Sequence, residues 1–147
     1  MADELSVVGQ RLPRKEAARK VTGQLKFYSD LCFPDMLYMR ILRSPYAHAN
    51  ILSIDTSKAK ALSGVKAVIT HEDVPDVLLN YPDLVHILDD RVFYAGCEVV
   101  AIAAVSEEVA EEATKLIDVE YQELPVLLDP EDALDSNAPE IHPGTPN

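Results

Sequence analysis

The sequence holds few of the residues that cofactor loops, metal clusters and cross-links require. It has 5 glycines, 2 cysteines and no tryptophan in 147 residues. The glycines are scattered and Gly96 has no glycine neighbour, so the chain cannot form the glycine-rich loop that holds a dinucleotide or a phosphate. Cys32 and Cys97 lie far apart, which excludes a disulfide framework or a Cys-x-x-Cys metal site and predicts small buried side chains in a reducing cytoplasm.

A net positive charge and long apolar runs are also missing. The net charge is −12, whereas nucleic acids and anionic membranes need a basic face, so we expect neither as a partner. No segment approaches the run of about 18 apolar residues that a membrane span needs. The acidic start of the chain lacks the apolar centre of a secretory signal. The chain is 48% hydrophobic, which suits one globular domain with a buried core.

The most strongly patterned stretch runs from residue 94 to residue 125. Val99–Val105 is an unbroken apolar run of strand length, which predicts a strand buried on both faces. Ser106 is a candidate N-cap for the helix that follows, and from Ile117 the period becomes two, which predicts a second strand. We expect this strand–helix–strand unit to form the core. The helix should face the sheet with Val109, Ala113 and Leu116 and face water with Glu108, Glu111, Glu112 and Lys115.

The remaining elements are expected to be shorter and to complete an α+β fold with a mixed, largely antiparallel sheet and two or three helices. A short helix over 57–62 should be capped by Asp55 or Thr56 and end at Gly64. Residues 70–91 are the least regular part, a loop that can hold one short helix. Further expected elements are a central strand at 37–43, strands at 50–55 and 65–69, the last of them buried, and a helical turn at 130–134 that begins at Pro130.

Several short motifs occur in a fixed order along the chain. The most specific is Arg43-Ser44-Pro45-Tyr46-Ala47-His48-Ala49. The others are Val8-Gly9 with Arg14, Lys20-Val21-Thr22-Gly23, Tyr94-x-Gly96, and Asp118-Val119-Glu120-Tyr121 with Leu124-Pro125. Together they resemble the α/β-hammerhead domain that begins the large, molybdenum-cofactor subunit of the xanthine dehydrogenase and aldehyde oxidase family. Cys97, Glu98 and Val100 depart from it, since the family usually has a Gln-like residue, a proline and an alanine there.

The resemblance implies an α/β-hammerhead domain with a structural role. It predicts an N-terminal arm at 1–22, the hammerhead domain at 23–128 and a linker at 129–147. The parent enzyme would hydroxylate aldehydes or N-heterocycles with oxygen from water, at a molybdenum–pterin cofactor. The implied partners are the remainder of the molybdenum subunit and iron–sulfur and flavin subunits or domains. In the family, the pterin-contacting loops and the catalytic glutamate lie downstream, so we assign no catalytic, cofactor-binding or metal-binding residue here and expect this chain alone to be inactive.

Individual polar residues support this expectation. The histidines His48, His71, His86 and His142 have no metal-ligand spacing, and His48 is expected to hydrogen-bond the backbone of its own loop. Cys97 has acidic neighbours that raise the pKa of a thiol, which favours a buried cysteine over a nucleophile. The acidic pairs predict solvated faces; they are Glu72-Asp73, Asp89-Asp90, Glu107-Glu108 and Glu111-Glu112.

Two alternatives remain open from the sequence. One is a stand-alone protein-interaction or assembly module with the same fold, and the weaker one is a small acidic hydrolase with a site around Cys97 and His48. We expect the isolated chain to fold by itself, because the strand–helix–strand core is self-contained. Gly96, at the entrance to the buried strand, is expected to have a positive φ or a close backbone neighbour.

Overall fold

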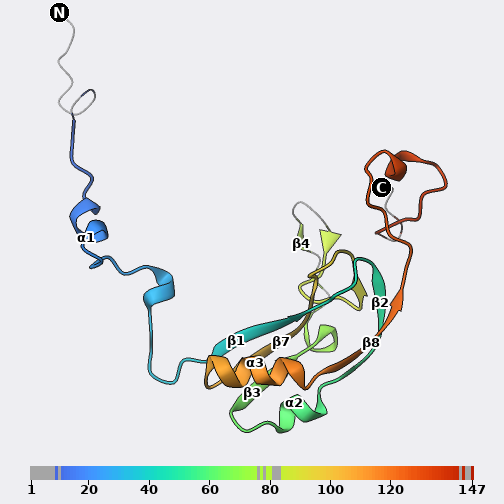
Figure 1. Cartoon of the computed structure of the whole chain (residues 1–147), viewed down its shortest axis with the longest axis horizontal. Coiled ribbons are helices and arrows are strands. Elements are labelled where there is room, and N and C mark those ends of the chain that lie inside the picture. Colours follow the sequence, from blue (N-terminus) through green and yellow to red (C-terminus); the bar gives the residue numbers. More distant parts are fainter. Residues whose placement is uncertain are drawn as a thin grey trace, which may run out of the picture. The chain divides into compact units, whose positions relative to one another are not determined.

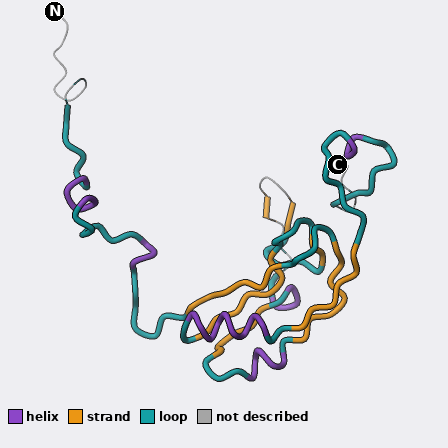
Figure 2. The backbone as a smooth tube through the Cα atoms, in the orientation of Figure 1, coloured by secondary structure: helices purple, strands orange, loops and turns teal. Residues whose placement is uncertain are grey.

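The computed structural model describes residues 9, 11–75, 77, 79–80, 84–142, 144 and 147. The chain divides into two compact units, Met1–Pro34 and Asp35–Asn147. Figures 1 and 2 show the elements of each unit. Val8 of the predicted Val8-Gly9 motif, and Pro143 and Pro146 of the predicted linker, lie outside the described residues.

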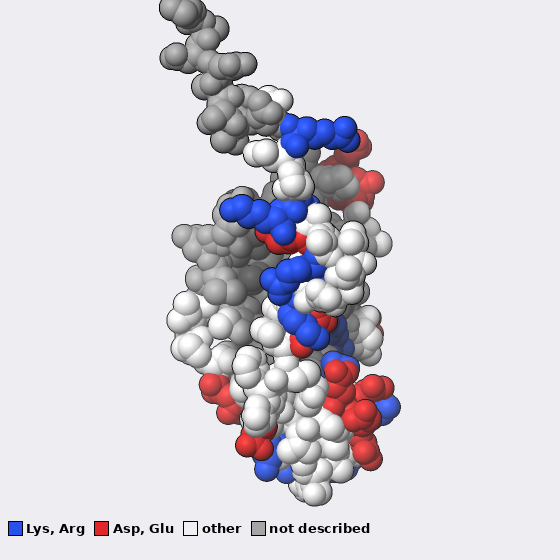
Figure 3. All heavy atoms as spheres, turned by 90° about the vertical axis from the view of Figure 1, so that its left-hand side faces the viewer, with Lys and Arg blue, Asp and Glu red and all other residues white. Residues whose placement is uncertain are grey.

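The first unit contains two short helical elements, α1 (Ala17–Val21) and the 3-10 turn η1 (Tyr28–Asp30). Neither contains a buried residue. Six of the thirteen basic residues of the chain lie in residues 1–34, against four of the twenty-five acidic ones, and basic side chains follow one another along this segment in Figure 3. This unit therefore carries +2 and the second unit −14. Among the described residues, the hydrophobic core clusters lie in the second unit.

The first sheet of the second unit, sheet A, has the strand order β1-β7-β3. Strand β7 (Glu98–Ala104) lies in the centre and pairs antiparallel with both β1 (Tyr38–Arg43) and β3 (Val65–Ile69). The prediction of a central strand at 37–43 is therefore wrong, because β1 is an edge strand. The prediction that 65–69 is buried is also wrong, since Val68 is the one buried residue of β3.

Helix α3 (Glu107–Lys115) packs on one face of sheet A. The Ser106 Oγ accepts a hydrogen bond from the Val109 N–H at 3.3 Å, so the predicted N-cap is confirmed. Ala110 and Ala113 are buried, and the acidic residues of the helix are exposed as predicted. The turn before β3 lies against the start of this helix, because a Cβ built on Gly64 would stand 2.9 Å from Val105 Cγ2.

The second sheet, sheet B, has the strand order β6-β2-β8 and is also antiparallel. Its strands are β6 (Arg91–Val92), β2 (Ala49–Asp55) and β8 (Asp118–Glu123). Helix α3 thus connects a strand of sheet A to a strand of sheet B rather than two strands of one sheet. The expected strand–helix–strand core is nevertheless present, since buried residues of β7 and α3 pack with Ile54 and Val119 of sheet B.

The other elements of the second unit are short. They are α2 (Ser57–Ala61), η2 (His71–Asp73), the hairpin strands β4 (Leu79–Asn80) and β5 (Leu84–Val85), and η3 (Asp132–Leu134). Of the two predicted candidates, Thr56 holds the N-cap position of α2 without a side-chain cap bond, and the Asp55 Oδ1 accepts the Ser57 N–H at 2.9 Å. The helical turn expected from Pro130 begins two residues later. The predicted α+β class is confirmed, and each sheet is antiparallel throughout its described pairings.

Candidate functional site

The most specific sequence motif, which begins at Arg43, meets the Tyr94-x-Gly96 motif where the chain passes between sheets A and B. The Gly96 N–H donates to the Ser44 carbonyl oxygen at 2.9 Å, and the Ser44 N–H donates to the Cys97 carbonyl oxygen at 2.9 Å. Ser44 is itself buried, and its Oγ accepts the Tyr46 N–H at 3.0 Å, which fixes the turn at Pro45. We call Arg43, Ser44 and residues 94–98 the motif junction. It joins segments that lie about fifty residues apart in the chain.

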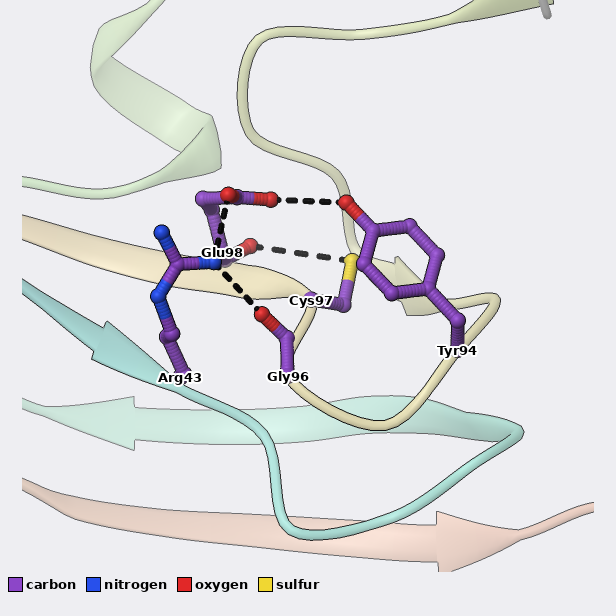
Figure 4. A network of polar contacts seen from close by, with 5 residues as sticks. All are labelled: Arg43, Tyr94, Gly96, Cys97 and Glu98. Carbon is purple, nitrogen blue, oxygen red and sulfur yellow. Dashed lines mark hydrogen bonds and ion pairs between the residues drawn. The ribbon is translucent and has the colours of Figure 1, made fainter.

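The charged side chains of the motif junction bind one another (Figure 4). Arg43 Nη1 donates to Glu98 Oε1 at 2.6 Å and to the Gly96 carbonyl oxygen at 2.7 Å. The Tyr94 hydroxyl donates to Glu98 Oε2 at 2.9 Å. Both carboxylate oxygens of Glu98 therefore have a donor. Glu98 is one of the residues that depart from the family pattern, and these contacts are what the substituted side chain makes.

The protonation states of this network suit a fixed structural contact. The hydrogen bond to Glu98, followed by burial, raises the pKa of Tyr94 to about 12. Burial acts to raise the pKa of Glu98, but the hydrogen bonds from Tyr94 and Arg43 outweigh it and hold that pKa below its ordinary value. Near neutral pH the carboxylate is ionised and the phenol keeps its proton. A general acid or base needs a pKa near the working pH, and neither group has one.

Cys97 is buried in the motif junction, as predicted. Its side chain is 8% exposed, and burial, together with the charge of Glu98, raises the pKa of the thiol. A nucleophilic cysteine needs the opposite shift. Cys32, by contrast, is exposed in the first unit, so the prediction that both cysteines are buried is wrong for Cys32. The described helical elements of the first unit contain no buried residue that could belong to a core around it.

A cavity of about 250 Å³ lies beside the motif junction. Its lining is mostly apolar, and the polar groups on it are acidic or already paired. The residues that line it include His86, Leu88, Asp89, Phe93, Tyr94, Cys97 and Glu98. The part of the chain that the structure describes contains no group of three or more His, Cys, Asp or Glu side chains placed to hold a metal ion.

His48 makes its contacts outside its own loop, so the expectation of a hydrogen bond within that loop is wrong. Its ring is buried, with Nδ1 2.6 Å from the Pro125 carbonyl oxygen and Nε2 2.8 Å from Arg91 Nη2. A guanidinium can only donate, so Nε2 accepts and Nδ1–H donates to Pro125. The His48 carbonyl oxygen also accepts the Leu124 N–H at 3.0 Å. His48 therefore fixes the end of β8 against the start of β2 and β6.

One acidic pair departs from the solvated face that was predicted. Asp89 is 16% exposed and accepts a hydrogen bond from His86 Nδ1 at 2.8 Å and one from the Arg91 N–H at 3.2 Å. Burial raises the pKa of Asp89, but the hydrogen bond from His86 outweighs it and lowers that pKa. The hydrogen bond with Asp89 raises the pKa of Asp90. The other three pairs include only exposed residues, as expected.

A family model described as "Aldehyde oxidase and xanthine dehydrogenase, a/b hammerhead domain" matches residues 22–125. The chain belongs to this family. The motif junction and His48 both lie inside the matched region, and the resemblance of the ordered sequence motifs is confirmed. The α/β-hammerhead fold expected from those motifs is confirmed with it.

Named relatives agree with this assignment. The chain is 48% identical over 132 residues to a probable xanthine dehydrogenase chain of Bacillus subtilis, covering 88% of this chain and 18% of that protein. It is 36% identical over 151 residues to "Nicotinate dehydrogenase large molybdopterin subunit" of Eubacterium barkeri, covering 99% of this chain and 35% of that protein. The structure of the aldehyde oxidoreductase from Desulfovibrio gigas matches 92% of the hammerhead chain with a TM-score of 0.80 and 35% identity. The matched part is 16% of that protein.

Sequence reasoning found the members of the motif junction but missed how they combine. The sequence marks Arg43 and Tyr94 as motif positions and Glu98 as a departure from the family pattern. It does not predict the contacts that Glu98 makes with Arg43 and Tyr94. The opposite charges of Arg43 and Glu98, each at the end of a strand, were the available signal. Arg91 was missed as the partner of His48, and nothing in its local sequence marks that contact.

No helix in the described part of the hammerhead chain has the length and apolar character that crossing a bilayer requires.

Proposed function

We propose that this chain is a non-catalytic structural domain of a molybdenum hydroxylase, either a fragment or a naturally split subunit of the large chain. The observation that carries the proposal is the motif junction, in which Arg43, Tyr94 and Glu98 satisfy one another and leave no group poised for acid–base chemistry. The charged side chains of the motif junction thus act on the fold. The parent enzyme would hydroxylate aldehydes or N-heterocycles with oxygen from water. Its other parts are the remainder of the molybdenum subunit and iron–sulfur and flavin subunits or domains.

The residues of this chain do not fit the molybdenum–pterin cofactor. A pterin phosphate is anionic and is held by free backbone N–H groups of glycine-rich loops or helix N-termini. The N–H of Gly96, at the one glycine of the motif junction, already donates to Ser44. The adjacent cavity carries the carboxylates of Asp89 and Glu98, which would repel such a ligand. The cofactor and its chemistry therefore belong, in this proposal, to the remainder of the enzyme.

The proposed division of the chain follows from this role. Residues 23–128 form the hammerhead domain, 1–22 an arm and 129–147 a linker toward the cofactor-binding part. The basic charge of the first unit suits an arm that lies against an acidic neighbour.

The test is to purify the chain and measure its metal content and its activity. We expect no stoichiometric molybdenum or iron by elemental analysis, no visible absorbance, and no reduction of a dye acceptor with xanthine or an aldehyde. In the native host, the chain should co-purify with a molybdenum-containing polypeptide or continue into one. One bound metal per chain, or turnover by the chain alone, would contradict the proposal.

The alternative function is a stand-alone protein-interaction or assembly module with the hammerhead fold. The observation that favours it is an apolar surface on sheet A in which Met39, Ala67 and Ile69 are exposed. The composition of the native complex discriminates between the two functions, because an assembly module would leave the mature enzyme. The buried thiol of Cys97, with its raised pKa, argues against the hydrolase alternative.

A further inference from the structure

In two adjacent rows of sheet A, the face that points away from α3 holds only apolar side chains, and the charged pair Arg43 and Glu98 lies at the end of the sheet beyond these rows. Strand register places Met39 beside Ala103 and Ala103 beside Ala67, and in the next row Ile41 beside Ala101 and Ala101 beside Ile69. Alternate residues of a strand share a face. We call these six residues, Met39, Ile41, Ala67, Ile69, Ala101 and Ala103, the outer apolar face.

The contacts of Arg40 establish which side this face is on. Arg40 Nη2 binds Glu107 Oε2 at 2.7 Å, and Glu107 is the first residue of α3. Arg40 therefore points to the helix side of the sheet, and its neighbours Met39 and Ile41 point to the other side. Met39 is 61% exposed and Ile69 38% exposed, and Ala67 is exposed as well. In the second unit no described element fully covers these residues.

Such a face is unusual for a sheet that meets water. Antiparallel sheets with one solvated face normally alternate apolar and polar residues, and contiguous exposed apolar patches mark interaction surfaces. The opposite edges of sheet A, β1 and β3, both contribute to the outer apolar face, so it spans the full width of the sheet. The pattern is that of a sheet covered on both sides.

We propose that the outer apolar face docks against the remainder of the molybdenum hydroxylase large subunit, through an apolar surface of that partner. The inference rests on the proposed function. Its support is length: this chain matches 18% of the Bacillus subtilis relative and 16% of the Desulfovibrio gigas structure, so most of each related protein lies outside the matched domain. A second copy of this chain is disfavoured as the occupant because the second unit carries a net charge of −14, and pairing two copies face to face would bring like charges together.

The test is hydroxyl-radical footprinting of Met39 in the isolated chain and in the whole molybdenum hydroxylase purified from the native host. Methionine oxidises readily, and Met39 is the methionine of the outer apolar face. We expect Met39 to be oxidised in the isolated chain and its oxidation to be lost in the complex. A free methionine peptide in each sample controls the radical dose.

A second arm uses variants in the host gene. Met39→Asp combined with Ala67→Asp should abolish co-purification with the larger polypeptide, because two carboxylates would be buried in an apolar contact. Leu52→Asp is the matched control, since Leu52 is 58% exposed on β2 of sheet B, and it should leave the complex intact. The thermal midpoints of the isolated variant chains show whether each one folds.

The outcomes separate the two proposals. Equal oxidation of Met39 in both samples, or an intact complex with the double variant, would overturn the docking face and leave the structural role standing. Protection of Met39 in the isolated chain together with a dimeric mass would assign the face to a second copy and overturn the inference. Recovery of the chain from its host without any larger molybdenum polypeptide would overturn the proposed function and the docking face together.

Discussion

Sheets A and B have the same number of strands and the same antiparallel pairing, but their outward faces differ. In sheet B the outward positions form polar pairs across strands: Asn50 Nδ2 donates to Gln122 Oε1 at 3.3 Å, and Ser53 Oγ donates to Glu120 Oε2 at 3.2 Å. In sheet A the outer apolar face holds only alanine, isoleucine and methionine. Sheet B therefore has the composition of a sheet with one solvated face, and sheet A that of a sheet covered on both faces.

The difference explains an apparent conflict within β7. The sequence predicts a strand buried on both faces, yet Ala101 and Ala103 are only half-buried, while Val99, Val100, Ile102 and Ala104 are buried. The prediction is wrong for the chain taken alone. The apolar run still indicates that both faces of β7 need a covering layer. In this chain α3 covers one of the two faces. Strand composition thus carries information about neighbours that lie outside the domain.

The largest expected loss of stability comes from a substitution that distinguishes the two faces of sheet A. Ile102 is fully buried at the centre of β7, so Ile102→Ala should lower the free energy of unfolding by about 2–5 kcal/mol through lost burial and an unfilled cavity. Ile69→Ala, on the outer apolar face, should cost under about 1 kcal/mol in the isolated chain because Ile69 already meets water. Urea unfolding of both variants measures this. Equal losses would show that the outer apolar face is covered within the chain itself.

A smaller effect is expected where α2 turns into sheet A. Gly64 has φ +97°, and a Cβ there would approach Val105 Cγ2 to 2.9 Å. Gly64→Ala should therefore cost about 2–4 kcal/mol, because backbone strain and overpacking add. Gly96 has φ +92° with nothing within 4 Å of its Cβ position, so Gly96→Ala should cost about 1–2 kcal/mol from strain alone. Thermal unfolding of the two variants compares them, and a costlier Gly96→Ala would contradict the packing account.

Beside sheet B, the buried ring of His48 makes polar contacts with Pro125 and Arg91, away from the outward face. His48→Ala removes a buried ring and leaves the Pro125 carbonyl oxygen and Arg91 without this partner, which should cost about 1–3 kcal/mol. Asn50→Ala on the outward face of β2 is the control and should change stability by less than about 0.5 kcal/mol. Denaturant unfolding checks both. A neutral His48→Ala would mean that water replaces the ring's contacts.

The sequence was sufficient to predict those features that depend on a local pattern of residues. Ser106 as N-cap, Ala113 in the core and a positive φ at Gly96 each depend on neighbours within a few residues. The α+β class and the hammerhead family also followed from the sequence, since the motifs are contiguous. These features need no knowledge of which strands pair.

Features that depend on long-range pairing could not be predicted. Whether β1 is an edge or a central strand depends on β3 lying on the other side of β7, which no local pattern encodes. The contact of His48 with Arg91 and Pro125 joins residues 43 and 77 positions apart. The burial of Asp89 depends likewise on how an irregular loop folds back on the sheet.

The smallest expected effect lies in the loop that leads from β6 of sheet B to β7 of sheet A. The pKa of Tyr94 is raised to about 12 by its hydrogen bond to Glu98, from an ordinary value of 10.0. A raised folded-state pKa gives stability that is complete below pH 10 and is lost as the pH rises toward 12. Tyr94→Phe should remove this alkaline loss and change stability little at neutral pH, because Tyr94 is about half exposed.

Ultraviolet titration of tyrosinate measures this pKa directly. The wild-type chain should show a tyrosine that ionises near pH 12 and is absent from Tyr94→Phe, whereas the ionisation of Tyr121, whose pKa is raised by burial, should remain in that variant. Glu98→Gln should move the ionisation of Tyr94 back toward its ordinary value because the carboxylate is gone. Tyr28, exposed in the first unit, supplies the matched control, and Tyr28→Phe should leave the late ionisation unchanged. If Tyr94 ionised together with the exposed tyrosines, its hydroxyl would not be bound to Glu98, and the loop would not hold the two sheets through this contact.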